Sequence, residues 1–107
     1  MSEDADAQDC PPAPDFPGAL VRDLLIVNKK GLHARATAKF VQCVDRYDAD
    51  IKVHRCGETV GRDSIMGILT LGAGIGTTIT VAATGAQAQE ALDAIAALVA
   101  DRFGEEA

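Results

Sequence analysis

Aromatic residues are scarce in this sequence, making up 4% of it, and tryptophan is absent. Proteins that bind single-stranded nucleic acid commonly stack bases on aromatic side chains and carry an excess of basic residues. This chain has a formal net charge of −6 instead, so nucleic-acid binding is disfavoured. A core must be built mainly from Val, Ile, Leu and Ala, with Phe40 and Phe103 as its large side chains.

Long apolar runs are lacking too. No stretch approaches the roughly 20 consecutive apolar residues that a membrane-spanning helix needs, so no membrane association is expected. Residues 1–15 are acidic and rich in proline, where a secretory leader would be basic and then apolar, which predicts a cytoplasmic protein. The three cysteines, Cys10, Cys43 and Cys56, are odd in number and widely spaced, which favours neither a disulfide framework nor a metal site.

The N-terminal segment lacks basic residues. From Met1 to Gly18 there are five acidic residues, four prolines and no Lys or Arg. Such a composition predicts disorder, because little of it can be buried. We therefore expect residues 1–20 to be a disordered acidic tail and residues 21–107 to be one domain. A solvated extension is a simpler interpretation of the tail than an acidic arm that competes for a basic surface.

The pattern of apolar residues predicts the element order βαββαβα. Alternation over Asp50–Arg55 places Lys52 and His54 together on one face, so His54 is expected to face solvent. Strands that are apolar on one side only indicate an α+β fold in which helices cover one face of an antiparallel sheet. The predicted strands are Asp23–Asn28, Asp50–Arg55, Glu58–Val60 and Thr77–Thr84, and the predicted helices are Ala34–Arg46, Ser64–Leu71 and Ala86–Phe103.

One segment lacks acidic residues altogether, and it contains a histidine at a predicted helix start. No Asp or Glu occurs between Asp23 and Asp45, whereas lysines and Arg35 do. His33 follows a glycine turn and precedes an apolar helical face. The free amides and positive dipole end of a helix favour anions, and an arginine can bind phosphoryl oxygens in bidentate fashion. Helix position alone would make His33 no more than a capping or surface residue.

Two motifs together resemble the motifs of one known protein family. GLHARATAKF, Gly31 to Phe40, is followed about thirty residues later by DSIMGILTLG, Asp63 to Gly72. The first resembles the active-site motif of HPr, the histidine phosphocarrier of the phosphoenolpyruvate-dependent phosphotransferase system, and the second resembles the regulatory serine segment of that family. The resemblance extends from about Arg22 to the C-terminus.

This resemblance implies the open-faced β-sandwich of the family, with a four-stranded antiparallel sheet and three helices on one face. It implies that His33 accepts a phosphoryl group on Nδ1 from Enzyme I and passes it to a IIA-type protein, with Arg35 stabilising the phosphate. Such a protein is a monomeric phosphoryl carrier for sugar transport or regulation rather than a turnover enzyme, and it needs no cofactor and no metal.

The resemblance also makes Ser64 a candidate regulatory phosphorylation site for an HPr serine kinase/phosphorylase. The preceding Asp63 departs from the basic residue common in serine-regulated members, which disfavours a kinase that reads a basic residue there. Partner proteins are expected to dock on the first helix and the serine segment, through Ala34, Ala38, Ile65, Met66 and Leu69.

A second departure is Ala36, where many members have proline; it leaves one more amide free. Together with Thr37 and Lys39, it makes the chain more similar to HPr proteins of nitrogen-type relays than to those of sugar uptake, and both branches stay open. Two other classes also remain: a small α/β ligand-binding regulatory module without phosphoryl transfer, and an acyl-phosphate hydrolase. The hydrolase would need a group that orients water, and none is evident in the sequence.

Overall fold

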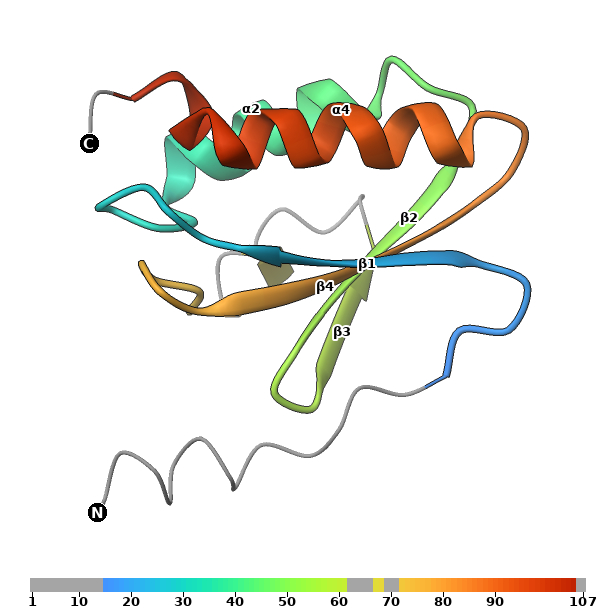
Figure 1. Cartoon of the computed structure of the whole chain (residues 1–107), viewed down its shortest axis with the longest axis horizontal. Helices are drawn as coiled ribbons and strands as arrows, with labels where there is room; N and C mark the ends of the chain where they lie inside the picture. The colour runs from blue at the N-terminus through green and yellow to red at the C-terminus, as the bar shows by residue number, and fades with distance from the viewer. Residues whose placement is uncertain (1–14, 62–66, 69–71, 106–107) are drawn as a thin grey trace.

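A computed structural model describes residues 15–61, 67–68 and 72–105 of the chain. Four antiparallel strands form one sheet in the order β1-β4-β2-β3, and the α-helices lie side by side over one of its faces (Figure 1). The elements are β1 (Leu20–Leu25), α2 (Ala34–Val44), β2 (Asp50–Arg55), β3 (Glu58–Gly61), β4 (Thr78–Thr84), α4 (Ala88–Ala100) and the 3₁₀ turn η1 (Arg102–Gly104).

The predicted antiparallel sheet with helices on one face is confirmed, but the prediction of three helices is confirmed only in part. The described residues contain the two α-helices α2 and α4. Most of the helix predicted over Ser64–Leu71 lies outside the described residues. Gly67 and Ile68, which belong to that segment, are helical, and the side chain of Ile68 is buried.

The first strand and the last helix differ in extent from their predictions. β1 begins at Leu20 rather than at Asp23, because the ladder with β4 already starts where Leu20 lies opposite Ala83. α4 ends at Ala100 rather than at Phe103. The backbone beyond it enters the left-handed region, with φ of 57° at Arg102 and 54° at Phe103, so the helix cannot continue.

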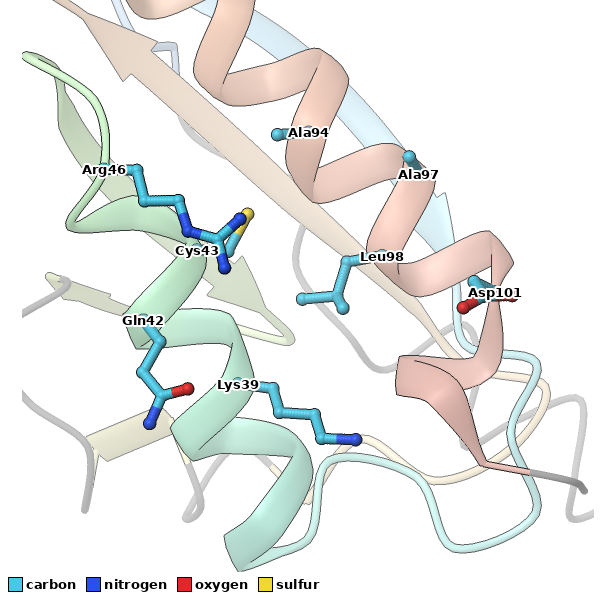
Figure 2. Close-up of a pocket in the computed structure, with 8 residues that line it drawn as sticks. All are labelled: Lys39, Gln42, Cys43, Arg46, Ala94, Ala97, Leu98 and Asp101. Atoms are coloured by element: carbon cyan, nitrogen blue, oxygen red, sulfur yellow. The ribbon is translucent and has the colours of Figure 1, made fainter.

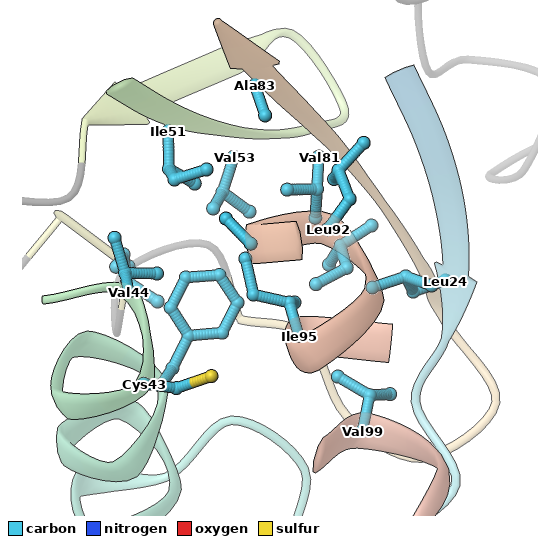
Figure 3. Packing of buried hydrophobic residues seen from close by; sticks show 14 of the residues in the cluster. Leu24, Cys43, Val44, Ile51, Val53, Val81, Ala83, Leu92, Ile95 and Val99 are labelled. Carbon is cyan, nitrogen blue, oxygen red and sulfur yellow. The ribbon is translucent and has the colours of Figure 1, made fainter. Parts of the chain in front are cut away.

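The core lies between the helices and the inner face of the sheet (Figure 3). Phe40 from α2 and Phe103 from η1 are fully buried, as the sequence predicted for the two large fillers. Around them pack aliphatic side chains from three strands and from α4: Leu24, Ile51, Val53, Ile79, Val81, Leu92, Ile95 and Val99. Burying each large apolar side chain stabilises the fold by about 1.5–3 kcal/mol. This layer therefore fixes the positions of α2 and α4 on the sheet.

Two expectations about individual side chains were wrong. His54 is only 4% exposed, although it lies on the sheet face opposite the helices, and its Nδ1 is 2.8 Å from Oγ1 of the cross-strand residue Thr59. Strand alternation determines which face a residue occupies, but not whether that face is covered. Cys56, in the turn between β2 and β3, is disulfide-bonded, whereas no disulfide was expected from the cysteine spacing.

The expectations for residues 1–14 of the acidic tail lie outside the described residues. In the part of the chain that the structure does describe, every helix is too short or too polar to cross a membrane.

Candidate functional site

His33 is the N-cap residue of α2, at the position that the sequence predicted. Its backbone is extended, its carbonyl oxygen accepts a hydrogen bond from the amide of Thr37 at 2.8 Å, and its Nδ1 accepts one from the amide of Arg35 at 3.2 Å. The first turn of α2 contains no acidic side chain. One ring nitrogen of His33 therefore lies at the positive end of a helix, where backbone N–H groups converge.

A tight loop before the helix fixes this histidine. Gly31 has a φ of +67°, and a Cβ placed on it would lie 2.4 Å from the carbonyl oxygen of Ala73. That same oxygen accepts a 2.8 Å hydrogen bond from the amide of Leu32. The loop before β4 thus packs directly against the residues that precede His33, and only glycine fits at position 31.

The other ring nitrogen of His33 contacts an acidic residue from the far end of the chain. Nε2 is hydrogen-bonded to Oε2 of Glu105, and the two side chains are 27% and 18% exposed. The second carboxylate oxygen, Oε1, accepts a 3.0 Å hydrogen bond from Nδ2 of the buried Asn28, which also donates to the Gly31 carbonyl at 2.8 Å. The hydrogen bond with His33, and then that with Asn28, holds the pKa of Glu105 below its ordinary value.

Sequence reasoning missed both Asn28 and Glu105. Glu105 is 72 residues from His33 and 77 from Asn28, and nothing in its spacing or in a local motif indicates this contact. Asn28 was interpreted only as the last residue of the predicted strand Asp23–Asn28. Its complete burial is a property of the folded loop.

The remaining predicted site residues fall into two groups. Ala34 and Arg35 are exposed and Ala38 is half-buried, all on the first turns of α2 beside His33. The predicted regulatory and docking residues of the second motif, Ser64, Ile65, Met66 and Leu69, lie outside the described residues. Their position relative to His33 therefore stays a prediction.

A cavity of about 640 Å³ lies between the outer sides of α2 and α4. Figure 2 shows the Lys39 side chain reaching across it toward the end of α4. Burial raises the pKa of the Cys43 thiol in its wall, so this cysteine is a poor nucleophile. His33 does not line the cavity, which is formed by Lys39, Gln42, Cys43, Arg46, Ala94, Ala97, Leu98 and Asp101.

A helix N-terminus that presents an imidazole is a site where a phosphoryl group can be bound. Residues 20–101 match the family described as "PTS HPr component phosphorylation site". The chain belongs to the HPr family. HPr is a phosphocarrier of the phosphotransferase system, so the protein carries phosphoryl groups rather than turning over a substrate.

Individual relatives support the assignment to HPr. The chain is 50% identical over 86 residues to phosphocarrier protein HPr of Cupriavidus necator, which covers 80% of this chain and 97% of that protein. It is 42% identical over 86 residues to phosphocarrier protein NPr of Shewanella violacea, covering 80% and 94%. Among solved structures, HPr of Thermoanaerobacter tengcongensis superposes with a TM-score of 0.78 at 38% identity, covering 82% of this chain and 99% of that one.

Proposed function

We propose that Nδ1 of His33 accepts a phosphoryl group from phosphorylated Enzyme I and passes it to a IIA-type protein. The observation that carries this proposal is the direction of Nδ1, which lies 3.2 Å from the Arg35 amide at the start of α2. A phosphoryl group on that nitrogen would lie at the helix N-terminus, where backbone amides and the helix dipole stabilise anions.

Side-chain charge supports the same reaction. Arg35 is exposed, so its guanidinium is free to turn toward a phosphoryl group on the neighbouring His33. Phosphoryl transfer depends mainly on positioning and charge stabilisation, which these groups supply without covalent chemistry of their own. A carrier must also release what it binds, and an exposed arginine can follow the phosphoryl group to the next protein.

Docking and regulation follow from the family. Partners are proposed to contact Ala34 and Ala38 on α2, together with Ile65, Met66 and Leu69. Ser64 is proposed as a regulatory site for a serine kinase/phosphorylase, because a phosphate adds about −1.5 to −2 charges beside this docking surface. Ser64→Asp should slow phosphoryl exchange with Enzyme I and Ser64→Ala should not; equal rates for the two variants would exclude regulation at this position.

We propose a cytoplasmic relay and a monomeric carrier, as membership of the HPr family implies. The residues Ala36, Thr37 and Lys39 favour the nitrogen-type branch over sugar uptake. Initial rates with a general and a nitrogen-type Enzyme I, measured at equal donor concentration, decide between the branches. Faster phosphorylation by the general enzyme would contradict the nitrogen-type assignment.

The decisive experiment is intact-mass analysis after incubation with Enzyme I and phosphoenolpyruvate. The wild type should gain one phosphate that is lost on acid treatment, and His33→Ala should gain none. His54→Gln is the matched control, because it removes the other histidine of the chain and should leave phosphorylation intact. Unchanged acid-labile phosphorylation of His33→Ala would place the acceptor elsewhere. No phosphorylation of the wild type by either donor would favour a ligand-binding module.

A further inference from the structure

We propose that Glu105 is a positioning residue, which holds a proton on Nε2 of His33 and thereby presents Nδ1 as the nucleophile. This inference deepens the proposed function and rests on it. It assigns a role to a side chain that lies outside both sequence motifs and beyond residues 20–101, the part of the chain that matches the family.

The two hydrogen bonds of the imidazole define one tautomer. A neutral imidazole has one N–H donor and one acceptor nitrogen. Nδ1 faces the Arg35 amide, which is itself a donor, so Nδ1 must carry the lone pair. Nε2 faces a carboxylate oxygen of Glu105, which is an acceptor, so Nε2 must carry the proton. In the opposite tautomer, an N–H at Nδ1 would face the Arg35 N–H, and a lone pair at Nε2 would face the Glu105 carboxylate.

Hydrogen bonds hold both the Glu105 side chain and the backbone around it in place. Nδ2 of Asn28 binds its other oxygen at 3.0 Å, and Asn28 is itself fixed by the Gly31 carbonyl in the loop before His33. The Glu105 amide donates to the Arg102 carbonyl at 2.9 Å. Nζ of Lys39, on α2, donates to the Phe103 carbonyl at 2.7 Å. Glu105 is therefore a fixed partner of the ring rather than the tip of a free chain end.

Backbone strain in the preceding turn points the same way. Arg102, Phe103 and Gly104 all have positive φ, of 57°, 54° and 77°, and the first two are not glycine. A left-handed conformation costs a non-glycine residue about 1–2 kcal/mol, and such strain concentrates at functional sites. This left-handed turn reverses the direction of the chain after α4, and Phe103 is buried within it. Glu105 comes to lie beside His33 as a result.

During phosphoryl transfer, the proton of the His33 ring would stay on Nε2. The Nδ1 lone pair forms the new bond to phosphorus while the bond from phosphorus to the donor breaks, and that electron pair leaves with the donor. The ring becomes positively charged with its proton still on Nε2, and the Glu105 carboxylate stabilises this charge. When the phosphoryl group moves on, the electron pair of the N–P bond returns to Nδ1 and a neutral imidazole leaves.

The test uses the full-length chain, labelled with ¹⁵N in histidine, at alkaline pH. In the wild type, the nitrogen shifts should report Nε2–H, and the Nε2 proton should be visible because its hydrogen bond slows exchange with water. Glu105→Gln and Glu105→Ala should lose that signal, and their phosphorylation by Enzyme I should slow by about tenfold or more. Glu58→Gln, an exposed glutamate of β3, is the matched control and should change neither readout.

Wild-type His33 in the Nδ1–H tautomer, or a Nε2 proton that stays equally protected in both Glu105 variants, would overturn the inference. Faster phosphorylation of the variants would overturn it too, because the carboxylate would then be a competitor for the phosphoryl site. The spectra need no phosphoryl donor. A wild type that shows the protected Nε2–H but accepts no phosphate would therefore refute the proposed function and leave the tautomer assignment in place.

Discussion

The Nζ atom of Lys39 donates a 2.7 Å hydrogen bond to the carbonyl oxygen of Phe103. This bond joins the middle of α2 to the left-handed turn that follows α4, and the Lys39 side chain is half-buried where it crosses between the two helices (Figure 2). It satisfies the carbonyl of a residue in the turn η1, beyond the end of α4. A single side chain therefore connects the helix that carries His33 to the segment that carries Glu105.

Replacing Lys39 by methionine should lower the free energy of unfolding by about 1.5 kcal/mol, the typical cost of losing a hydrogen bond from a charged donor. Methionine keeps most of the apolar stem that packs between the helices. Lys52→Met is the matched control, since Lys52 contacts only the exposed Asp50 among the interactions described and should cost no more than about 0.5 kcal/mol. Urea unfolding of the two variants measures the difference, and equal losses would show that the Phe103 bond is weak.

Gly31→Ala should be among the more damaging substitutions in the loop before α2. It would combine a left-handed φ with a Cβ placed 2.4 Å from the Ala73 oxygen, for a total cost of about 3 kcal/mol. Gly76→Ala separates the two effects, because Gly76 also has a positive φ but has no atom within 4 Å of an added Cβ. It should cost only about 1 kcal/mol. Similar melting temperatures for Gly31→Ala and Gly76→Ala would mean that the loop before β4 moves away from the added Cβ.

The depressed pKa of Glu105 predicts a pH dependence of stability. Its ionised form is favoured in the folded protein, so its contribution is present above the ordinary glutamate pKa and is lost as the pH falls through the folded value. The melting temperature of the wild type should therefore exceed that of Glu105→Gln at neutral pH, and the gap should close in acid. Thermal scans of both proteins between neutral pH and about pH 3 test this. The difference in melting temperature isolates Glu105, because the two proteins share all other carboxylates. A constant gap would contradict it.

Arg35→Lys should slow phosphoryl transfer from Enzyme I by about tenfold, which corresponds to losing one charge-assisted hydrogen bond of about 1.4 kcal/mol. Lysine keeps the charge but not the planar fork that binds two phosphoryl oxygens. Arg46→Lys is the matched control, because Arg46 lies two residues past the end of α2 and lines the cavity between α2 and α4. Its transfer rate should be unchanged. A wild-type rate for Arg35→Lys would remove Arg35 from the proposed site.

Local patterns predicted the elements of this fold well, and the reason is visible in the core. In β2, Ile51 and Val53 alternate with outward-facing residues, and in α4, Leu92, Ile95 and Val99 recur at helical spacing; all five are buried. The position of His33 before α2 was predictable for a similar reason, because a glycine turn and a helix start are signals within a few residues of it.

Long-range relations were not predictable in this way. The Glu105 contact depends on the left-handed turn at Arg102 and Phe103, and neither residue type signals a positive φ. The burial of His54 depends on what covers the second face of the sheet, which the strand's own sequence does not contain. For His33, a segment distant in sequence therefore determines the environment of the ring.

The return of the chain from α4 to His33 has a practical consequence for anyone who handles this protein. A purification tag or fluorescent fusion attached after Ala107 would begin two residues beyond Glu105, which contacts His33. Residues 15–19, which precede β1, leave from the sheet side of the molecule, away from the helices (Figure 1). Labels and surface attachments therefore belong at the N-terminus, and kinetic data from C-terminal fusions should be compared with the untagged chain.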